Sequence, residues 1–388
     1  MNCSTLEEYL NNKPLYYDKI DFDVVKESWD IISYHIKLPY VIHIVGTNGK
    51  GSTGRFLASF LNQLEKKVLH YSSPHILEFN ERIWIDGYNS TNNQLDFAHE
   101  KLQSILNKDH LEKLTYFEYT TLIALVLSHS MDYIVLEAGL GGEFDATNVV
   151  KNDLTLLTTI GLDHQEFLGD NIKDITLTKA RSCDKAMIIG KQQNSEVINH
   201  IRELFNTTRE IISIDEQEDI NLDFYNKSLP FYLLDNLKQV FCSLNYLNLS
   251  ITKNLELPKL FGRYEKLTNN ITIDVGHNPL AALAISKELT KENKKVLLIY
   301  NSYKDKDYEN VLSILKPNVI EVQIINCEEL RIVEKKTLED VLNSFNIKYK
   351  DFKIKEMKDD INYLIFGSFL VVEEFLKQYN RYPKIDTK

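Results

Sequence analysis

Short apolar runs alternate with segments of helical periodicity along most of the chain. The runs are rich in β-branched residues, which is typical of buried strands, and they lie at 41–45, 68–73, 132–139, 154–160 and 185–190. Residues 1–38 have helical spacing, as have 55–66 and 117–130, and a loop is expected over 80–87. Strands that alternate with helices in this way are typical of a parallel sheet covered by helices.

The alternation restarts after 252–262, a stretch without periodicity that we interpret as a linker. The later strands are expected at 271–276, 295–301, 319–325, 352–355 and 363–368, with helices between them and after the last one. The sequence therefore predicts an α/β protein: a P-loop-type doubly wound parallel sheet domain over 1–257, followed by a smaller Rossmann-like α/β domain over 258–388.

Composition and charge exclude several classes of protein. The 388 residues are 43% apolar and 26% charged, which suits a globular chain with real cores. The net charge is 45 − 56 = −11, which argues against nucleic acid as a partner. We expect no membrane span and no secretory signal, because no run of about 18 apolar residues occurs and the N-terminus lacks a basic and an apolar region. The four cysteines form no CxxC motif, which fits a reducing cytoplasm.

Glycine is scarce but concentrated in two places. Of the 14 glycines, four lie between 46 and 54 and three between 139 and 142. The first group, GTNGKGSTG, separates a predicted strand from a predicted helix, where backbone N–H groups and the helix dipole can hold a phosphate. Lys50 supplies a positive charge for the β- and γ-phosphates, although Ile44 stands where the usual P-loop motif has its first glycine. The alternative is an ordinary turn rich in Gly and Asn.

Glu137 ends the predicted strand 132–139, just before the second glycine group. A carboxylate at the C-terminal end of a parallel strand beside a phosphate loop suits a magnesium ion, which binds oxygen ligands and needs few protein groups. The alternative is a glutamate that only caps the next turn.

Seven motifs in one order resemble the folylpolyglutamate synthase/dihydrofolate synthase family of the Mur ligase superfamily. They are GTNGKGS, SSPHILEFNERI, YFEYTT, LEAGLGGEFDATN, TTIGLDH, FGRYE and DVGHNP. The resemblance runs from about residue 40 to about residue 280 and weakens towards the C-terminus. It implies an ATP-binding domain of the Mur ligase central type over 1–257 and a glutamate ligase domain over 258–388.

The resemblance also implies roles for individual residues. ATP would be bound by Gly49, Lys50, Gly51, Ser52, Asn236, Arg263 and Asp274. Magnesium would be held by Ser73, Glu137 and His164, and a monovalent cation is left open. The pterin substrate would be held by Thr115, Tyr116, Phe117, Glu118, Phe144, Asp145 and Ala146. The catalytic residues would be Lys50, His277 and Lys179, the last of them carbamylated.

Two of these assignments have plain alternatives, and the chain departs from the family pattern in four places. His164 alone would suit a turn, and Lys179 alone would suit an exposed helix surface. Carbamylation of Lys179 requires a neutral amine and hence a lowered pKa. The departures are Glu143, where the family has arginine; Thr178–Arg181, where it has Glu-Lys-Ala-Gly; Pro230–Leu233, where it has Gly-x-His-Gln; and Asp274–Pro279, where Asp-Val-Gly-His-Asn-Pro replaces Asp-Gly-Ala-His-Asn-Pro.

The resemblance implies an ATP-dependent ligase that joins L-glutamate to dihydropteroate and to reduced folates through an acyl phosphate. A single-activity enzyme of either kind is the first alternative, and a nucleotide-binding switch without ligase activity is the second. The expected partners are small molecules only, and the expected state is a cytoplasmic monomer.

Overall fold

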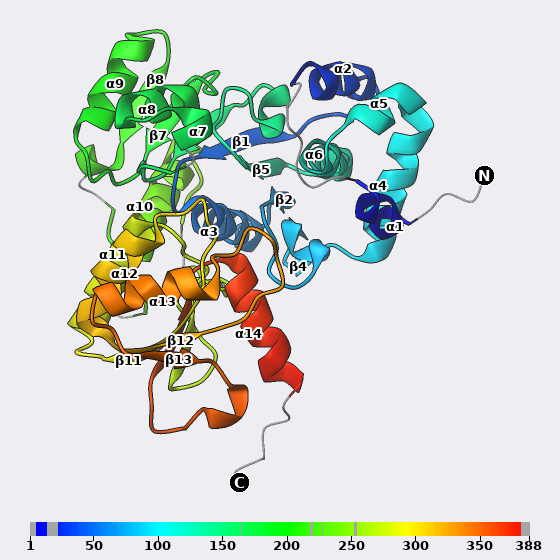
Figure 1. The fold of residues 1–388 in the computed structure, drawn as a ribbon. Coiled ribbons are helices and arrows are strands. Elements are labelled where there is room, and N and C mark those ends of the chain that lie inside the picture. Colours follow the sequence, from blue (N-terminus) through cyan, green and yellow to red (C-terminus); the bar gives the residue numbers. More distant parts are fainter. Residues whose placement is uncertain are drawn as a thin grey trace. The chain divides into compact units, whose positions relative to one another are not determined.

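The chain divides into two compact units in the computed structural model (Figure 1). The structure describes residues 5–13, 22–163, 165–217, 220–226, 228–251 and 254–381. One unit contains Met1–Leu229 and Leu233–Pro258, and the other contains Pro230–Tyr232 and Lys259–Lys388. That the two units carry ATP binding and glutamate ligation, as expected for 1–257 and 258–388, remains a prediction.

The first unit is built on an eight-stranded sheet in the order β4-β3-β2-β5-β1-β6-β7-β8. The strands from β2 to β8 in this order run parallel, and β3 and β4 add an antiparallel edge. The strands are β1 (Tyr40–Val45), β2 (Val68–Tyr71), β3 (Ile83–Ile85), β4 (Tyr88–Asn89), β5 (Tyr133–Glu137), β6 (Leu154–Leu157), β7 (Ala186–Ile189) and β8 (Glu210–Ser213).

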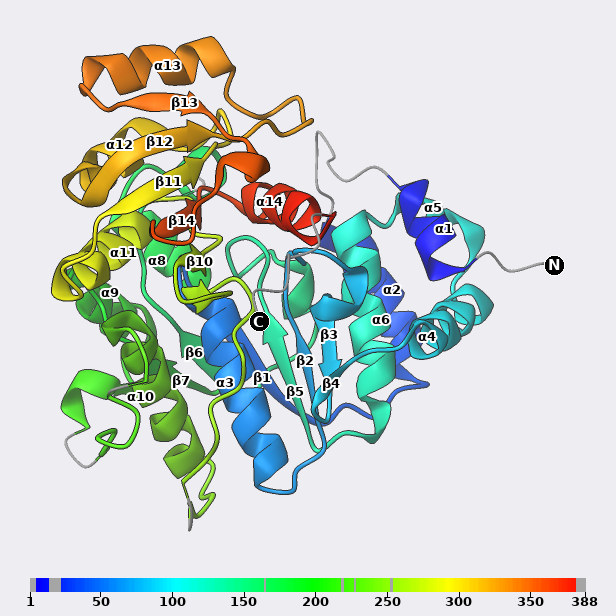
Figure 2. The same cartoon turned by 90° about the horizontal axis from the view of Figure 1, so that it is seen from below.

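Helices cover both faces of this sheet (Figure 2). His70 of β2 lies against Gly54 of α3, whereas its neighbours Leu69 and Tyr71 share a core with Leu122 of α6. Successive strand residues point to opposite faces, so α3 and α6 lie on opposite sides. The helices are α1 (Leu6–Asn11), α2 (Phe22–Ser33), α3 (Lys50–Gln63), α4 (Asn92–Ile105), α5 (Lys108–Lys113), α6 (Tyr116–Leu127), α7 (Gln165–Leu168), α8 (Ile172–Ala180), α9 (Glu196–Phe205) and α10 (Phe231–Tyr246).

The second unit repeats this architecture on a smaller scale. Its sheet has the order β13-β12-β11-β14-β10-β9, and only β9 is antiparallel to its neighbour. The strands are β9 (Glu265–Lys266), β10 (Ile271–Ile273), β11 (Val296–Tyr300), β12 (Val319–Ile324), β13 (Tyr349–Asp351) and β14 (Tyr363–Phe366). The helices are α11 (Pro279–Lys291), α12 (Tyr308–Leu315), α13 (Lys335–Ser344) and α14 (Phe369–Arg381). The α/β fold with doubly wound parallel sheets is confirmed.

Two predicted elements are wrong. The segment expected to be a loop over 80–87 contains β3, which pairs with β2 because Ile83 and Trp84 are buried. Residues 352–355, expected to be a strand, instead lead into a 3-10 turn at Ile354–Glu356. The edge strand β13 lies just before them. The alternation in Phe-Lys-Ile-Lys mimics a strand, whereas the true edge strand is polar and has no apolar run to mark it.

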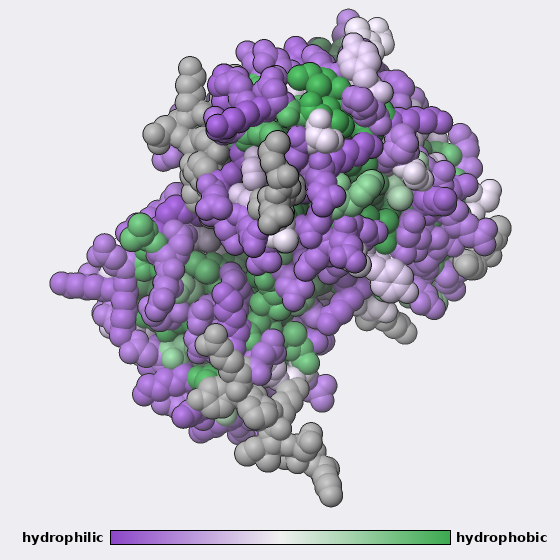
Figure 3. Space-filling model, turned by 90° about the vertical axis from the view of Figure 1, so that its right-hand side faces the viewer, coloured by the Kyte–Doolittle hydropathy of each residue, from purple (hydrophilic) through white to green (hydrophobic). Residues whose placement is uncertain are grey.

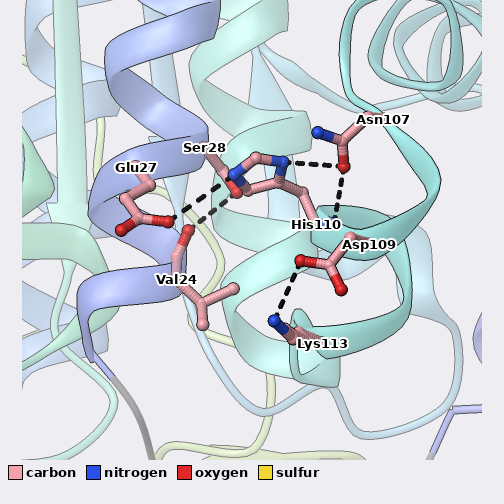
Figure 4. Close-up of polar contacts among 7 residues, drawn as sticks. All are labelled: Val24, Glu27, Ser28, Asn107, Asp109, His110 and Lys113. Atoms are coloured by element: carbon pink, nitrogen blue, oxygen red, sulfur yellow. Dashed lines mark hydrogen bonds and ion pairs between the residues drawn. The ribbon is translucent and has the colours of Figure 1, made fainter.

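Polar contacts hold α2 to α5 at the edge of the first unit (Figure 4). The ring of His110 lies between the two helices: its Nε2 is 3.7 Å from Oε2 of Glu27, and its Nδ1 is 2.9 Å from Oδ1 of Asn107. Lys113 donates to Asp109 within α5.

The face drawn in Figure 3 is mostly hydrophilic, with hydrophobic patches among the hydrophilic residues. Within the described residues, no helix has both the length and the apolar composition that crossing a bilayer requires.

Candidate functional site

The glycine loop at 46–49 connects the central strand β1 to α3. Gly49 has φ +93°, and a Cβ there would lie 2.8 Å from Oδ1 of Asn236. Gly46 has φ +150°, and a Cβ there would lie 1.9 Å from Oγ1 of Thr158. Side chains are therefore excluded from the cradle. Because Gly49 cannot cap the helix with a side chain, the first N–H groups of α3 are available to an anion.

Lys50 lies over this loop. Its Nζ donates to the carbonyl oxygens of Gly46, at 3.1 Å, and of Thr47, at 3.4 Å. The loop is held from outside as well, since the N–H groups of Thr47 and Asn48 donate to the carbonyl oxygen of Thr159 at 2.9 and 3.2 Å. Gly51 and the buried Ser52 follow in the first turn of α3. The cradle is preformed, and its shape and charge fit a polyphosphate.

Glu137 and Ser73 lie next to each other at the same edge of the sheet. Ile44 of β1 pairs with Glu137 of β5, so the carboxylate lies beside the entry to the loop. Glu137 is buried, and its Oε2 accepts a hydrogen bond from the N–H of Ser73 at 3.3 Å. His164 lies outside the described residues. Elsewhere in the described ranges, no group of three or more His, Cys, Asp or Glu side chains has a metal-binding arrangement. A carboxylate and a hydroxyl fit magnesium, which binds few protein oxygens.

Lys179 is buried at the end of α8, not exposed as the plain alternative required. Burial first and the positive charge of Lys50 second lower its pKa to about 7, while Asp145 and Asp163 act in the opposite direction. At neutral pH a large share of this amine is uncharged. Two departures from the family pattern lie beside it and pair with each other: Arg181 Nη1 is 3.3 Å from Oε2 of Glu143.

The segment 115–118 begins α6 with a capping box. The N–H of Thr115 donates to Oε2 of Glu118, and the N–H of Glu118 donates to Oγ1 of Thr115. Their side chains are thus used to start the helix. Phe117 lies against Gly139, since a Cβ on that glycine would be 2.7 Å from the Phe117 ring. Tyr116 lies next to the buried Arg82. The start of α6 therefore adjoins the second glycine cluster.

The segment 144–146 has one exposed and two buried side chains. Phe144 is 65% exposed, whereas Asp145 and Ala146 are buried. The Asp145 carboxylate accepts hydrogen bonds from the N–H groups of Leu140 and Thr147 and from the Thr147 hydroxyl, and burial raises its pKa. Asp145 therefore shapes the loop after β5.

Asn236 is buried in α10 and lies against Gly49, as the contact with a Cβ at that glycine shows.

Sequence reasoning missed Arg55, a second charged residue of α3. Burial lowers its pKa to about 10, while Glu137 and Glu81 act in the opposite direction. Its guanidinium lies 5.0 Å from the ring centre of Trp84. Arg55 is the one charged residue of α3 besides Lys50, and this was the available signal.

In the second unit, Asp274 follows β10 and is buried. One carboxylate oxygen accepts from the N–H of Tyr264 at 2.8 Å and the hydroxyl of Tyr232 at 3.3 Å; the other accepts from the N–H of Gly276 at 2.7 Å. Burial raises the Asp274 pKa, and the nearby Arg263 opposes this. Tyr232 lies in a segment noted only as a departure from the family pattern.

Arg263 and His277 lie on the two loops around Asp274. The Arg263 guanidinium is 5.0 Å from the ring centre of Phe369, and its Nη1 donates to the carbonyl oxygen of Gly262. His277 Nδ1 is 3.2 Å from the carbonyl oxygen of Val275, in the loop that precedes α11. The second unit thus gathers three of the predicted residues at one sheet edge.

A glycine-lined cradle with an acidic strand end beside it, in a chain with two parallel α/β sheets, has the architecture of the Mur-type ligases. No family model matches the chain. A Haemophilus influenzae protein named dihydrofolate synthase/folylpolyglutamate synthase is 32% identical and is aligned over 96% of this chain and 97% of its own. The chain belongs to the dihydrofolate synthase/folylpolyglutamate synthase family, whose members are ligases.

Solved structures agree with this assignment. Helicobacter pylori folylpolyglutamate synthetase is 36% identical, with a TM-score of 0.78 and coverage of 97% of this chain and 98% of the other. Escherichia coli FolC in complex with ADP is 26% identical, with a TM-score of 0.83 and coverage of 97% and 96%. Another structure of that protein contains DHPP and ADP, with 26% identity, a TM-score of 0.82 and coverage of 96% of each chain.

Proposed function

We propose that this chain is a bifunctional ATP-dependent ligase that joins L-glutamate to dihydropteroate and to reduced folates. The observation that carries the proposal is the arrangement at one sheet edge of a glycine-lined cradle, Lys50 and the buried Glu137. Membership of the family supports the same conclusion.

In the first step, a carboxylate oxygen of the pterin substrate attacks the γ-phosphorus of ATP. The new P–O bond gives an acyl phosphate, and the bond to the β-phosphate oxygen breaks to release ADP. The N–H groups at the start of α3 hold the phosphates, and Lys50 stabilises the charge on the group in transfer. A magnesium ion, when bound, neutralises phosphate charge; Ser73, Glu137 and His164 are the residues we assign to it.

In the second step, the amine of L-glutamate attacks the acyl carbon. The C–N bond of the amide forms, the C–O bond to phosphate breaks, and the amine loses a proton. We assign Asn236, Arg263 and Asp274 to ATP, and His277 to the vicinity of the acyl phosphate. The pterin is assigned to 115–118 and 144–146.

Lys179 is assigned the role of a carbamylated lysine. Its burial and its lowered pKa support the assignment, because only a neutral amine reacts with carbon dioxide. The carbamate would place a negative charge near Lys50, the cation that contributes to lowering the pKa of the free amine.

A single-activity enzyme is the second candidate, because the Helicobacter pylori relative is named folylpolyglutamate synthetase alone. The Haemophilus influenzae relative carries both activities in its name, and we favour the bifunctional enzyme. We further propose that the protein acts in the cytoplasm as a monomer on small molecules.

The test is a product assay with MgATP, L-glutamate and either dihydropteroate or tetrahydrofolate. Phosphate release with both substrates, and an amide product from each, would support the bifunctional proposal. Turnover of one substrate alone would select the single-activity candidate. ATP binding without turnover of either would favour a nucleotide switch and reject the proposal.

A further inference from the structure

Several polar side chains of the loop between β2 and β3 hold it in shape. The Glu81 carboxylate accepts hydrogen bonds from the N–H groups of Ile76, Leu77 and Glu78, each at 2.8 Å. Asn80 donates to the carbonyl oxygen of Ser90 at 2.7 Å. The loop is therefore a rigid support built from its own sequence.

Arg82 is the exception in this loop. Its side chain is buried, with 9% of the residue exposed, and its Nε donates to Nδ1 of His75 at 2.8 Å. An arginine N–H only donates, so Nδ1 of His75 accepts this bond. In the part of the chain that the structure describes, neither Nη group of Arg82 has a hydrogen-bond partner.

Aromatic rings flank the guanidinium. Its central carbon lies 5.2 Å from the ring centre of Tyr116 and 5.9 Å from that of Phe79. Attraction to ring faces offsets part of the cost of burying a cation, but it leaves the planar N–H fork without an acceptor. A fork of this kind matches a carboxylate, which accepts two parallel hydrogen bonds.

The position of Arg82 indicates which carboxylate its guanidinium could bind. Its carbonyl oxygen accepts a hydrogen bond from the N–H of Ser72, next to the proposed magnesium ligand Ser73. Tyr116 belongs to the segment assigned to the pterin. An anion on Arg82 would thus lie beside aromatic rings and near the proposed metal site, as a carboxylate joined to an aromatic ring would.

We propose that Arg82 binds a carboxylate of the pterin substrate and that His75 positions its guanidinium. The inference rests on the proposed function and adds to it a residue that recognises the substrate anion. In dihydropteroate the only carboxylate is the one that reacts. In a reduced folate the anion on Arg82 is either the reacting carboxylate or its neighbour on the glutamate.

Calorimetric titration of Arg82→Gln with each substrate tests this. We expect the dissociation constant for a carboxylate-bearing pterin to rise about tenfold or more, since a charge-assisted bidentate pair is lost. If affinity falls for both substrates, Arg82 binds the reacting carboxylate. If affinity falls for tetrahydrofolate alone, Arg82 binds the neighbouring carboxylate. A hydroxymethyl pterin without a carboxylate should bind both proteins equally.

Arg209→Gln is the matched control. Arg209 also lies near an aromatic ring, at 6.0 Å from that of Phe205, but its donors are used by the carbonyl oxygens of Cys183 and Thr208. We expect this variant to bind the pterins as the unaltered protein does. If Arg82→Gln does not fold, Arg82→Lys keeps the charge and loses the fork, and it should bind the substrates with intermediate affinity.

Dissociation constants within twofold of those of the unaltered protein for both substrates, in Arg82→Gln or in a folded Arg82→Lys, would overturn the inference. The ligase proposal would survive that result, provided that the unaltered protein still turns over. Failure of the unaltered protein to bind either pterin would overturn both.

Discussion

The C-terminal sheet edges of the two units are alike in topology and differ in how their charged side chains are held. In the first unit, side chains of both signs gather around the glycine cradle: Lys50, Lys179 and Glu137. In the second, the buried Asp274 accepts three hydrogen bonds from its own surroundings. From this comparison we propose that the first edge acts on the transferring charge and that the second holds a ligand in place. Substitution of Lys50, Lys179 or Glu137 at the first edge should therefore impair turnover, whereas substitutions at the second edge should impair affinity.

The largest effect is expected for Lys50→Ala. Removal of the charge above the cradle should lower kcat about 100-fold or more with little change in the melting temperature, because the lysine stabilises charge that develops in the transition state. Steady-state phosphate release measures this. Lys67→Ala, at an exposed lysine just beyond α3, is the control. Full activity in Lys50→Ala would remove this lysine from the mechanism.

Gly49→Ala should have the next largest effect. A Cβ would lie 2.8 Å from Oδ1 of Asn236, and φ is +93°, so the strain of about 2 kcal/mol falls within the cradle. We expect ATP affinity to drop about tenfold or more in a nucleotide titration. Gly87→Ala is the control, since φ is +108° there but the nearest atom would be 3.8 Å away. An equal loss of ATP affinity in the two variants would mean that backbone strain alone, and not the contact in the cradle, causes the effect.

The pH dependence should reflect Lys179. Its pKa is lowered to about 7 from an ordinary value of 10.5, so the fraction of neutral amine increases as pH rises through about 7. Activity should rise with pH over this range and with added bicarbonate, and a labelled carbamate carbon should appear by NMR. Lys179→Arg, which stays charged, should lose both responses, whereas Lys173→Arg on the exposed side of α8 should keep them. A bicarbonate response that persists in Lys179→Arg would contradict the carbamate.

Tyr232→Phe should have the smallest effect. It removes one hydrogen bond to Asp274, worth about 1 kcal/mol, while the two backbone donors remain. We expect ATP to bind about fivefold more weakly, with kcat nearly unchanged, as the second edge is proposed to hold a ligand. Tyr349→Phe also loses a hydrogen bond, from Asn343, and should leave ATP binding unchanged. A drop in kcat without a change in affinity would reverse the contrast between the two edges.

The sequence predicted those parts of the fold that have a strong local pattern. The buried strands β1 and β5 are apolar runs, and Gly46 and Gly49 mark a close approach that only glycine permits. The edge strand β13 was misplaced because an exposed polar strand has no hydrophobic period.

Long-range partners were the part that local patterns could not give. The stacking of Tyr116 on Arg82 joins residues 34 positions apart, and the Tyr232–Asp274 bond joins residues 42 apart. The burial of Lys179 depends on how α8 packs against the loop after β5, where a Cβ on Gly142 would lie 2.7 Å from the carbonyl oxygen of Lys179. The roles assigned to these residues remain predictions.

The most direct test of the acyl phosphate is transfer of oxygen from the substrate to phosphate. Dihydropteroate labelled with the heavy isotope of oxygen in its carboxylate is incubated with the enzyme, MgATP and L-glutamate, and the released phosphate is analysed by mass spectrometry. We predict one labelled oxygen in each phosphate, because the oxygen that attacks the γ-phosphorus leaves with it when the amide forms. Phosphate without label, released together with the amide product, would contradict the mechanism.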